Sequence, residues 1–302
     1  VANVILVVAA DRPVPTCAVS RAVVANRLAA GLMVTASHNP AAYNGLKVKA
    51  PYGGSADTQT VEAIERRIGR SMVKRVRWEE AQRDGRISPA NLLPRYLAGI
   101  RAFIDLKAIR RRPLRVVVDP MHGAGGRLVE ELIGRGRCRV ETIHAQPDPL
   151  FGGRPPEPIA MHLGELSQTV RRRRADVGLA TDGDADRLGI IGPDGTWLNP
   201  GQVLCVLLEH LVRSRGASGA IVKTVSNTML INRLAEAMGL RLLEVPVGFK
   251  HIAQLMLEQD VLIGGEESGG IGVKGYLPER DGVLNGLLLL EAIAQRGQKL
   301  SA

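Results

Sequence analysis

The sequence is poor in aromatic residues and contains no long apolar run. Phe, Trp and Tyr make up only 3% of the 302 residues, so the core must consist mostly of aliphatic side chains. No segment approaches the roughly 18 uninterrupted apolar residues of a membrane-spanning helix, and no signal-peptide pattern follows Val1. We therefore expect a cytoplasmic protein without a membrane partner. Its length and 45% hydrophobic content suffice for two or three domains.

Paired cysteines are lacking as well. The three cysteines, Cys17, Cys138 and Cys205, are odd in number, far apart and without the CxxC spacing of a metal site. This distribution argues against a disulfide framework. It predicts reduced, unpaired thiols, which agrees with a cytoplasmic location.

Positive charge is in excess: the net charge is +10 and the pI is near 10. Such a balance favours either nucleic-acid binding or a field that attracts anionic small molecules. The arginine runs at 110–112 and 171–174 precede apolar segments, where exposed helix ends are expected. No aromatic residues that could stack on bases are interleaved with them. We therefore expect no nucleic-acid partner and a substrate such as a sugar phosphate.

Apolar runs alternate with helix-length patterns along the chain, which indicates βαβ units. Strands are expected at residues 4–9, 32–35, 115–118, 139–143, 188–191, 220–225, 241–245 and 261–263, and another leads into residue 182. Helices are expected at residues 60–68, 95–109, 128–133, 161–173, 203–212, 229–238, 250–258 and 283–293. The sequence thus predicts units at 1–95, 96–198 and 199–302, and the last two are similar enough to indicate repeated α/β domains.

The segment TDGDADR carries the strongest chemical signal. Asp182, Asp184 and Asp186 alternate, and in an extended segment their side chains would share one face. Three such carboxylates repel one another unless a cation lies between them, and oxygen ligands favour Mg²⁺ or Mn²⁺. An EF-hand loop is excluded, because its sixth position would be Arg187 and its twelfth Pro193. A polar turn between two strands remains the alternative.

The segment TASHNP places Ser37 between an expected strand and the turn signal Asn39-Pro40. A serine hydroxyl is a poor nucleophile without a base, but a phosphorylated serine is a phosphoryl donor and can also ligate a metal. His38 could donate a hydrogen bond to a phosphate oxygen, and Lys47 could neutralise charge or move a proton. Alternatively, Ser37 is an ordinary turn or N-cap residue.

Two further loops are weaker candidates. In GGEESGG the glycines allow close approach to a ligand, and Glu266 and Ser268 suit sugar hydroxyls; a flexible acidic turn is the alternative. Lys250 in VGFKH could contact a phosphate or could be an ordinary surface lysine. The segment DPMHGAGGRL only partly matches a dinucleotide fingerprint, because Leu128 takes the third Gly/Ala position, and we interpret it as a strand-to-helix turn.

Together, TASHNPAAYNGLKV, DGDADR and GEESGG resemble the loops of the α-D-phosphohexomutases, the phosphoglucomutase and phosphomannomutase group, and occur in that family's order. The resemblance covers essentially the whole chain. It implies that Ser37 is phosphorylated and, with the three aspartates, binds Mg²⁺, and that Arg187 lies beside the phosphoserine. It further implies that Glu266 and Ser268 bind substrate hydroxyls, that Lys47 transfers a proton and that His38 supports it.

The family resemblance also implies a reaction and a fold. Phosphate would move between O1 and O6 of a hexose through a bisphosphorylated sugar, with Mg²⁺ as cofactor and glucose 1,6-bisphosphate as activator. Glucose, mannose and glucosamine phosphates are not distinguished by these residues, and no oligomeric state is indicated. A sugar-phosphate or Mg²⁺-binding module without turnover is the alternative. The implied fold consists of tandem, similar three-layer α/β domains with mixed sheets.

Three departures from the family pattern stand out. The Gly-Ile-Arg-Gly segment of the first domain and the Arg-x-Ser-Gly-Thr-Glu-Pro loop of the fourth domain do not occur in the 302 residues. Gly270 stands where some members carry a sugar-contacting histidine. We therefore expect the chain to enter partway through the first domain and to lack the fourth. Because remote phosphate binding positions the substrate, we also expect little or no turnover from this chain alone.

Overall fold

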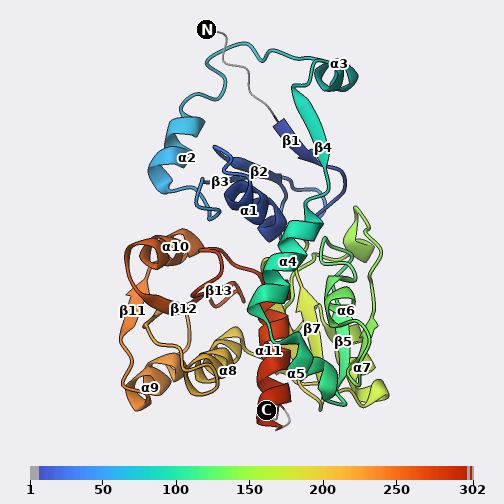
Figure 1. Ribbon diagram of the computed structural model, residues 1–302, viewed down its shortest axis with the longest axis vertical. Coiled ribbons are helices and arrows are strands. Elements are labelled where there is room, and N and C mark those ends of the chain that lie inside the picture. Colours follow the sequence, from blue (N-terminus) through green and yellow to red (C-terminus); the bar gives the residue numbers. More distant parts are fainter. Residues whose placement is uncertain (1–6, 298–299, 301–302) are drawn as a thin grey trace.

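The computed structural model describes residues 7–297 and 300, and its three α/β units follow one another along the chain (Figure 1). The first unit contains two separate two-stranded sheets. Strand β1 (Val7–Ala10) pairs in parallel with β4 (Ile87–Ala90), and β2 (Gly31–Val34) pairs antiparallel with β3 (Leu46–Lys49). Its helices are α1 (Thr16–Ala25), α2 (Thr58–Glu65) and α3 (Trp78–Arg83).

An apolar cavity of about 1010 Å³ lies between β1 and β2 and reaches the loop that carries Ser37. Leu32 and Val34 of β2 line it and are 61% and 67% exposed. The first unit therefore leaves part of its apolar surface uncovered by the described residues.

The second unit is built on a five-stranded sheet in the order β6-β5-β7-β8-β9. Its strands are β5 (Arg115–Asp119), β6 (Arg139–Thr142), β7 (Val177–Thr181), β8 (Leu188–Ile191) and β9 (Trp197–Leu198). Strands β5, β6 and β7 run parallel, whereas β8 and β9 are antiparallel to their neighbours, so the sheet is mixed. Its helices are α4 (Leu93–Phe103), α5 (Leu106–Arg111), α6 (Leu128–Ile133) and α7 (Gly164–Arg173).

The third unit repeats this design with a four-stranded mixed sheet in the order β11-β10-β12-β13. Its strands are β10 (Ala220–Thr224), β11 (Leu242–Val245), β12 (Val261–Gly265) and β13 (Ile271–Val273), and its helices are α8 (Pro200–Arg213), α9 (Leu230–Ala237), α10 (Phe249–Glu258) and α11 (Gly282–Arg296). Helix α11 is buried from residue 282 to 294 and contacts α5, α6 and α8. It therefore joins the second and third units (Figure 1, red).

Alternation along the central strand β5 explains the layers of the second unit. Val117 packs with Leu166 and Val170 of α7, on one face of the sheet. Val116 and Val118 belong to the large core on the other face. Since both faces are covered, the strand is a continuous run of valines rather than an alternating pattern, as expected for a parallel central strand. The predicted mixed α/β domains are confirmed.

Most predicted elements of the second and third units lie within three residues of the observed ones, but the helix expected at 95–109 is wrong. The chain is extended at Ile104, and the Asp105 side chain accepts a hydrogen bond from the amide of Ala108, so α5 begins as a new helix. The sequence prediction also missed α1, α3, β3, β4, β9 and β13. Part of the strand expected at 4–9 lies outside the described residues.

The expectation for cysteine and that for the second arginine run hold. In the first run, Arg110 is half-buried and its guanidinium donates hydrogen bonds to the carbonyls of Ile133 and Leu132. All three cysteines are buried and free. Arg171, Arg172 and Arg173 occupy the exposed last turn of α7, where cations interact favourably with the helix dipole. Among residues 7–297, no helix is apolar and long enough to span a bilayer.

A buried carboxylate, Glu291 of α11, fastens the α4–α5 connector to the third unit. Its oxygens accept hydrogen bonds from the guanidinium of Arg215 at 2.6 and 2.8 Å and from the amide of Asp105 at 2.8 Å, and His210 Nε2 lies 3.0 Å away. Burial alone would raise the pKa of Glu291, but these partners lower it to about 2. The ionised form is therefore the one that stabilises the fold.

The replacement Glu291→Gln should lower the free energy of unfolding at pH 7 by on the order of 3 kcal/mol, because one pKa unit corresponds to about 1.4 kcal/mol. Since the folded-state pKa is depressed, this stabilisation is present above pH 4.5 and is lost as the pH falls towards 2. Urea unfolding measured between pH 7 and pH 2.5 tests this. Glu141→Gln is the control, because the Glu141 side chain is 40% exposed and pairs with Arg173 at the surface. An unchanged acid slope in Glu291→Gln would contradict the prediction.

Candidate active site

The three predicted metal ligands converge in a tight turn between β7 and β8. One carboxylate oxygen of each of Asp182, Asp184 and Asp186 lies within 4.8 Å of the others, and all three residues are buried. The prediction that they lie on an extended segment is wrong. Ala185 is left-handed, with a φ of 58°, and its amide bonds the carbonyl of Asp182. The turn rather than strand alternation therefore brings the carboxylates together.

The unused oxygens of these carboxylates indicate what the turn can bind. Within the described part of the chain, Asp184 Oδ1 and Asp186 Oδ1 are buried without a hydrogen-bond partner. Their Oδ2 atoms accept hydrogen bonds from Lys47 Nζ at 2.6 and 2.7 Å, and the Thr16 hydroxyl also donates to Asp184 Oδ2. Buried carboxylate oxygens without donors are costly unless a cation binds them. The donor set consists of oxygens and fits a hard divalent cation such as Mg²⁺.

Charges within the cluster set its protonation. Burial, with the charges of Asp186 and Asp184, raises the pKa of Asp182 well above its usual range. Burial would also raise the pKa of Asp186, but Arg280 and Lys47 lower it below the usual range. For Lys47, burial is outweighed by Asp186 and Asp184, which raise its pKa. Lys47 is therefore a firmly protonated ammonium group at neutral pH.

Ser37 lies on the loop that connects β2 to β3, directly against the metal turn. Its hydroxyl donates to Asp182 Oδ2 at 2.9 Å, and its amide donates to Thr35 Oγ1 at 2.8 Å. Its φ of 55° is left-handed, which non-glycine residues adopt at a cost that clusters at functional sites. The antiparallel pairing of β2 with β3 places Lys47 in the same site. The structure therefore joins Ser37, Lys47 and the aspartates, which are far apart in sequence.

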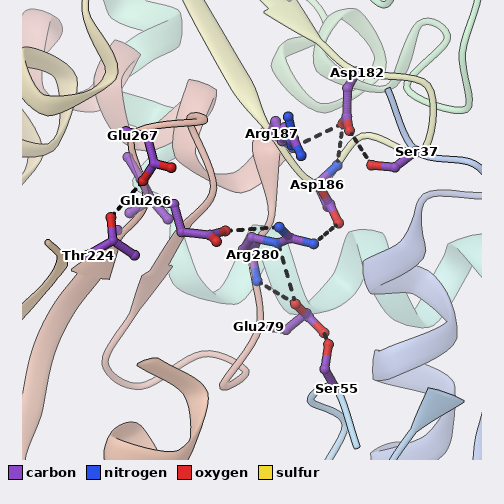
Figure 2. A network of polar contacts seen from close by, with 12 residues as sticks. Ser37, Ser55, Asp182, Asp186, Arg187, Thr224, Glu266, Glu267, Glu279 and Arg280 are labelled. Carbon is purple, nitrogen blue, oxygen red and sulfur yellow. Dashed lines mark hydrogen bonds and ion pairs between the residues drawn. The ribbon is translucent and has the colours of Figure 1, made fainter. Parts of the chain in front are cut away.

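His38 and Arg187 share one acidic neighbour, Glu157. His38 Nε2 lies 3.9 Å and Arg187 Nη1 3.5 Å from the same oxygen of Glu157. Burial and the charge of Arg187 lower the pKa of His38, so its imidazole is neutral at pH 7. The amide of Arg187 bonds Asp182, which is also the partner of Ser37 (Figure 2).

The glycine-rich loop that carries Glu266 lies beside the metal turn. The amide of Leu188 bonds the carbonyl of Gly269, and Glu266 is 6% exposed. Burial raises the pKa of Glu266, although Arg280 opposes this shift. Residues 266–269 form a turn, so the alternation of side chains along an extended strand does not apply to Glu266 and Ser268. Ser268 is half-buried.

Lys250 is not brought into this cluster. It is exposed at the start of α10 and makes no hydrogen bond or ion pair with the described residues of the site. A phosphate contact from Lys250 thus stays a sequence-based prediction.

Sequence analysis missed Arg280, the central residue of the polar network in Figure 2. Its guanidinium binds Glu266 Oε2 at 2.9 Å and Asp186 Oδ2 at 2.7 Å. The neighbouring Glu279 forms a fully buried ion pair with Lys49 of the first unit. These contacts join all three units around the site. In the sequence, these contacts are marked only by the charged triplet Glu-Arg-Asp before an apolar helix. Such a triplet ordinarily indicates a solvated loop.

Family models match the chain in three consecutive segments. Domains I, II and III of the phosphoglucomutase/phosphomannomutase family, each an α/β/α domain, match residues 1–74, 94–195 and 199–302. The chain belongs to the α-D-phosphohexomutase family. Its three loops therefore lie on a phosphohexomutase framework, in the order that the sequence resemblance implied.

Proteins named as phosphohexomutases are similar to this chain over most of its length. The crystal structure of a putative phosphomannomutase from Thermus thermophilus is 37% identical with a TM-score of 0.89, and the match covers 97% of this chain and 66% of that one. A Thermococcus kodakarensis phosphoglucomutase/phosphomannomutase is 31% identical over 90% of this chain and 59% of its own length. A probable phosphoglucosamine mutase from Methanothermobacter thermautotrophicus is 34% identical, and the match covers 94% of this chain and 60% of that protein. The chain thus spans about 60% of the length of these curated relatives.

Proposed function

We propose that this phosphohexomutase interconverts hexose 1-phosphate and hexose 6-phosphate, with glucose or mannose as the sugar. Phosphoserine 37 donates its phosphoryl group to the substrate, and the bisphosphorylated sugar returns the other phosphate to Ser37. The observation that carries this proposal is the 2.9 Å hydrogen bond between the Ser37 hydroxyl and Asp182, inside the buried triplet of carboxylates. A structural turn serine would not require such a site.

Asp182, Asp184 and Asp186 would hold Mg²⁺, with a phosphate oxygen on Ser37 as a further ligand. When bound, Mg²⁺ offsets negative charge on the transferring phosphoryl group. The neutral His38 and the cationic Arg187 flank this position and can donate hydrogen bonds to phosphate oxygens. Lys47 is protonated, so it would supply counter-charge during transfer and would donate a proton to the Ser37 oxygen as the phosphoryl group leaves. It would then accept the proton of the attacking sugar hydroxyl.

Glu266 and Ser268 would recognise the sugar. Arg280 binds Oε2 of Glu266 and leaves Oε1 to accept a hydrogen bond from a sugar hydroxyl. Glucose 1,6-bisphosphate, which carries both phosphates, would load Ser37 as the activator. The positive net charge attracts sugar phosphates, and we propose a cytoplasmic enzyme without a nucleic-acid or membrane partner.

The test is intact and peptide mass spectrometry after incubation with Mg²⁺ and glucose 1,6-bisphosphate. We expect one added phosphoryl group on the peptide that contains Ser37 and none in the Ser37→Ala variant. Ser167→Ala is a matched control, because Ser167 is also a half-buried serine but binds only a backbone carbonyl in the second unit. Labelling that persists in Ser37→Ala would exclude Ser37 as the acceptor.

A sugar-phosphate or Mg²⁺-binding module of the same fold without turnover is the second candidate, because the buried aspartate triplet could hold a cation without any transfer to Ser37. A chimera that adds the N-terminal and C-terminal segments of the Thermus thermophilus relative separates the two. Labelling of Ser37 and turnover in the chimera would identify a mutase. A chimera that binds glucose 6-phosphate without labelling would identify a binding module.

A further inference from the structure

Thr16, the first residue of α1, lies against the metal turn at residues 182–186 and belongs to none of the three motif loops. Its side chain is buried. Its hydroxyl donates a hydrogen bond to Asp184 Oδ2 at 2.5 Å, and its amide donates to the carbonyl of Asp184 at 2.9 Å. Both bonds therefore reach the same aspartate, which lies 168 positions further along the chain.

The hydroxyl of Thr16 does not stabilise its own helix. A threonine at a helix start ordinarily accepts a hydrogen bond from an amide of the first turn, and one inside a helix can donate to the carbonyl four residues before it. The N-cap position of α1 is Pro15, and no side chain caps the helix there. Because the Thr16 hydroxyl donates instead to a carboxylate of the second unit, its effect falls on Asp184.

Two donors share Oδ2 of Asp184 and leave its other oxygen free. Besides the Thr16 hydroxyl, Lys47 Nζ donates to Oδ2 at 2.6 Å, whereas Oδ1 is buried with no hydrogen-bond partner among the described residues. Lys47 has a long side chain and also binds Asp186. The hydroxyl of Thr16 has one proton, which goes to Asp184, and its β-branched side chain is restricted to few rotamers. Thr16 is therefore the donor that fixes the orientation of the Asp184 carboxylate.

Helix α1 holds Thr16 in place. The helix packs against α4, and the next residue, Cys17, is buried and donates from Sγ to the carbonyl of Arg280 in the third unit at 2.6 Å. The donor to Asp184 is thus anchored in the core on both sides. Groups that orient a metal ligand from behind in this way commonly strengthen metal binding by 10- to 100-fold.

We propose that Thr16 is a positioning residue of the metal site, which orients Asp184 so that its Oδ1 is presented to the cation. The unit that carries Ser37 would thereby help to form the metal site of the second unit. The inference rests on the proposed function, because it takes the three aspartates as Mg²⁺ ligands.

Calorimetric titration of the metal-free protein with Mg²⁺ and with Ca²⁺ tests this role. Thr16→Val keeps the β-branched shape but removes the hydroxyl, and it should weaken Mg²⁺ binding on the order of 10-fold. Ca²⁺ should lose less affinity, because Mg²⁺ demands nearly ideal octahedral geometry whereas Ca²⁺ accepts flexible ligands. Thr16→Ser keeps the donor and should bind Mg²⁺ as the wild type does. A purely structural role of Thr16 would not change the ratio of the two affinities.

Two further variants separate metal binding from folding. Thr16→Ala also removes the hydroxyl but places no methyl group beside the carboxylate, so it distinguishes loss of the donor from displacement by valine. Thr169→Val is the matched control, because Thr169 is also buried but accepts its hydrogen bond from Arg172 on α7. The rise of the thermal midpoint with Mg²⁺ concentration gives the affinity even of a destabilised variant.

The outcomes distinguish the two proposals. Wild-type Mg²⁺ affinity in Thr16→Val and Thr16→Ala, or an equal loss in Thr16→Ser, would overturn the inference about Thr16. Labelling of Ser37 in the wild type would in that case still support the proposed function. A wild-type chain that neither binds Mg²⁺ nor becomes labelled would overturn the proposed function and this inference with it.

Discussion

Asp182→Asn is expected to weaken Mg²⁺ binding by at least about 100-fold and to abolish phosphoryl transfer to Ser37. Asp182 Oδ1 accepts the amides of Asp186 and Arg187, whereas Oδ2 accepts the Ser37 hydroxyl. In the variant, the single amide oxygen must remain with the two backbone amides, so the NH₂ group faces Ser37 and the metal position. A donor would then replace a ligand oxygen, and even changes to residues behind a metal ligand commonly cost 10- to 100-fold.

Calorimetry with Mg²⁺ and Mn²⁺, followed by the labelling assay, measures this effect. Asp194→Asn is a matched control, because Asp194 also accepts a backbone amide in a turn but is exposed outside the site. A thermal midpoint close to that of the wild type would show that the fold is retained. Wild-type Mg²⁺ affinity in Asp182→Asn would refute the assignment of Asp182 as a ligand.

Gly183→Ala is expected to lower the rate of phosphoryl transfer on the order of 100-fold. A Cβ at Gly183 would lie 2.5 Å from the carbonyl oxygen of Ser37 and 3.1 Å from Pro156 Cγ. The first neighbour is backbone, so the Ser37 loop and the metal turn must separate. The carbonyl of Gly183 also accepts the amide of Ala124, which limits movement of the turn in the other direction. Misplacement of reacting groups by about 1 Å can cost this much in rate.

Single-turnover labelling of Ser37 and thermal unfolding would be measured together. Gly164→Ala is the matched control, because an added methyl group there meets no atom within 4 Å. Overpacking of this kind costs about 1–3 kcal/mol in stability. A Gly183→Ala chain with the wild-type labelling rate would mean that the contact between the two loops does not position Ser37.

The sequence analysis could name several residues that the structure brings together, because of where these residues lie in the chain. Ser37, Lys47 and the aspartates stand in short motifs, so their types and spacing carry the information. The extended conformation expected for residues 182–186 was wrong, because a left-handed residue at Ala185 turns the chain. Spacing alone does not distinguish a strand from such a turn.

Arg280 could not have been predicted in the same way. Its carboxylate partners come from two different units, and Asp186 is 94 residues away in the chain. Tertiary packing alone creates these contacts. The break between α4 and α5 is similar, because the apolar pattern continues through it and the capping carboxylate of Asp105 decides where the second helix begins.

The small sheets of the first unit have a practical consequence. Among residues 7–297, β1 pairs only with β4 and β2 only with β3, so an edge of each sheet remains open. The exposed Leu32 and Val34 lie on β2. Open strand edges with apolar side chains are templates for intermolecular pairing and aggregation. The 302-residue chain should therefore be purified and assayed at low protein concentration, where pairing of strand edges between molecules is least favourable.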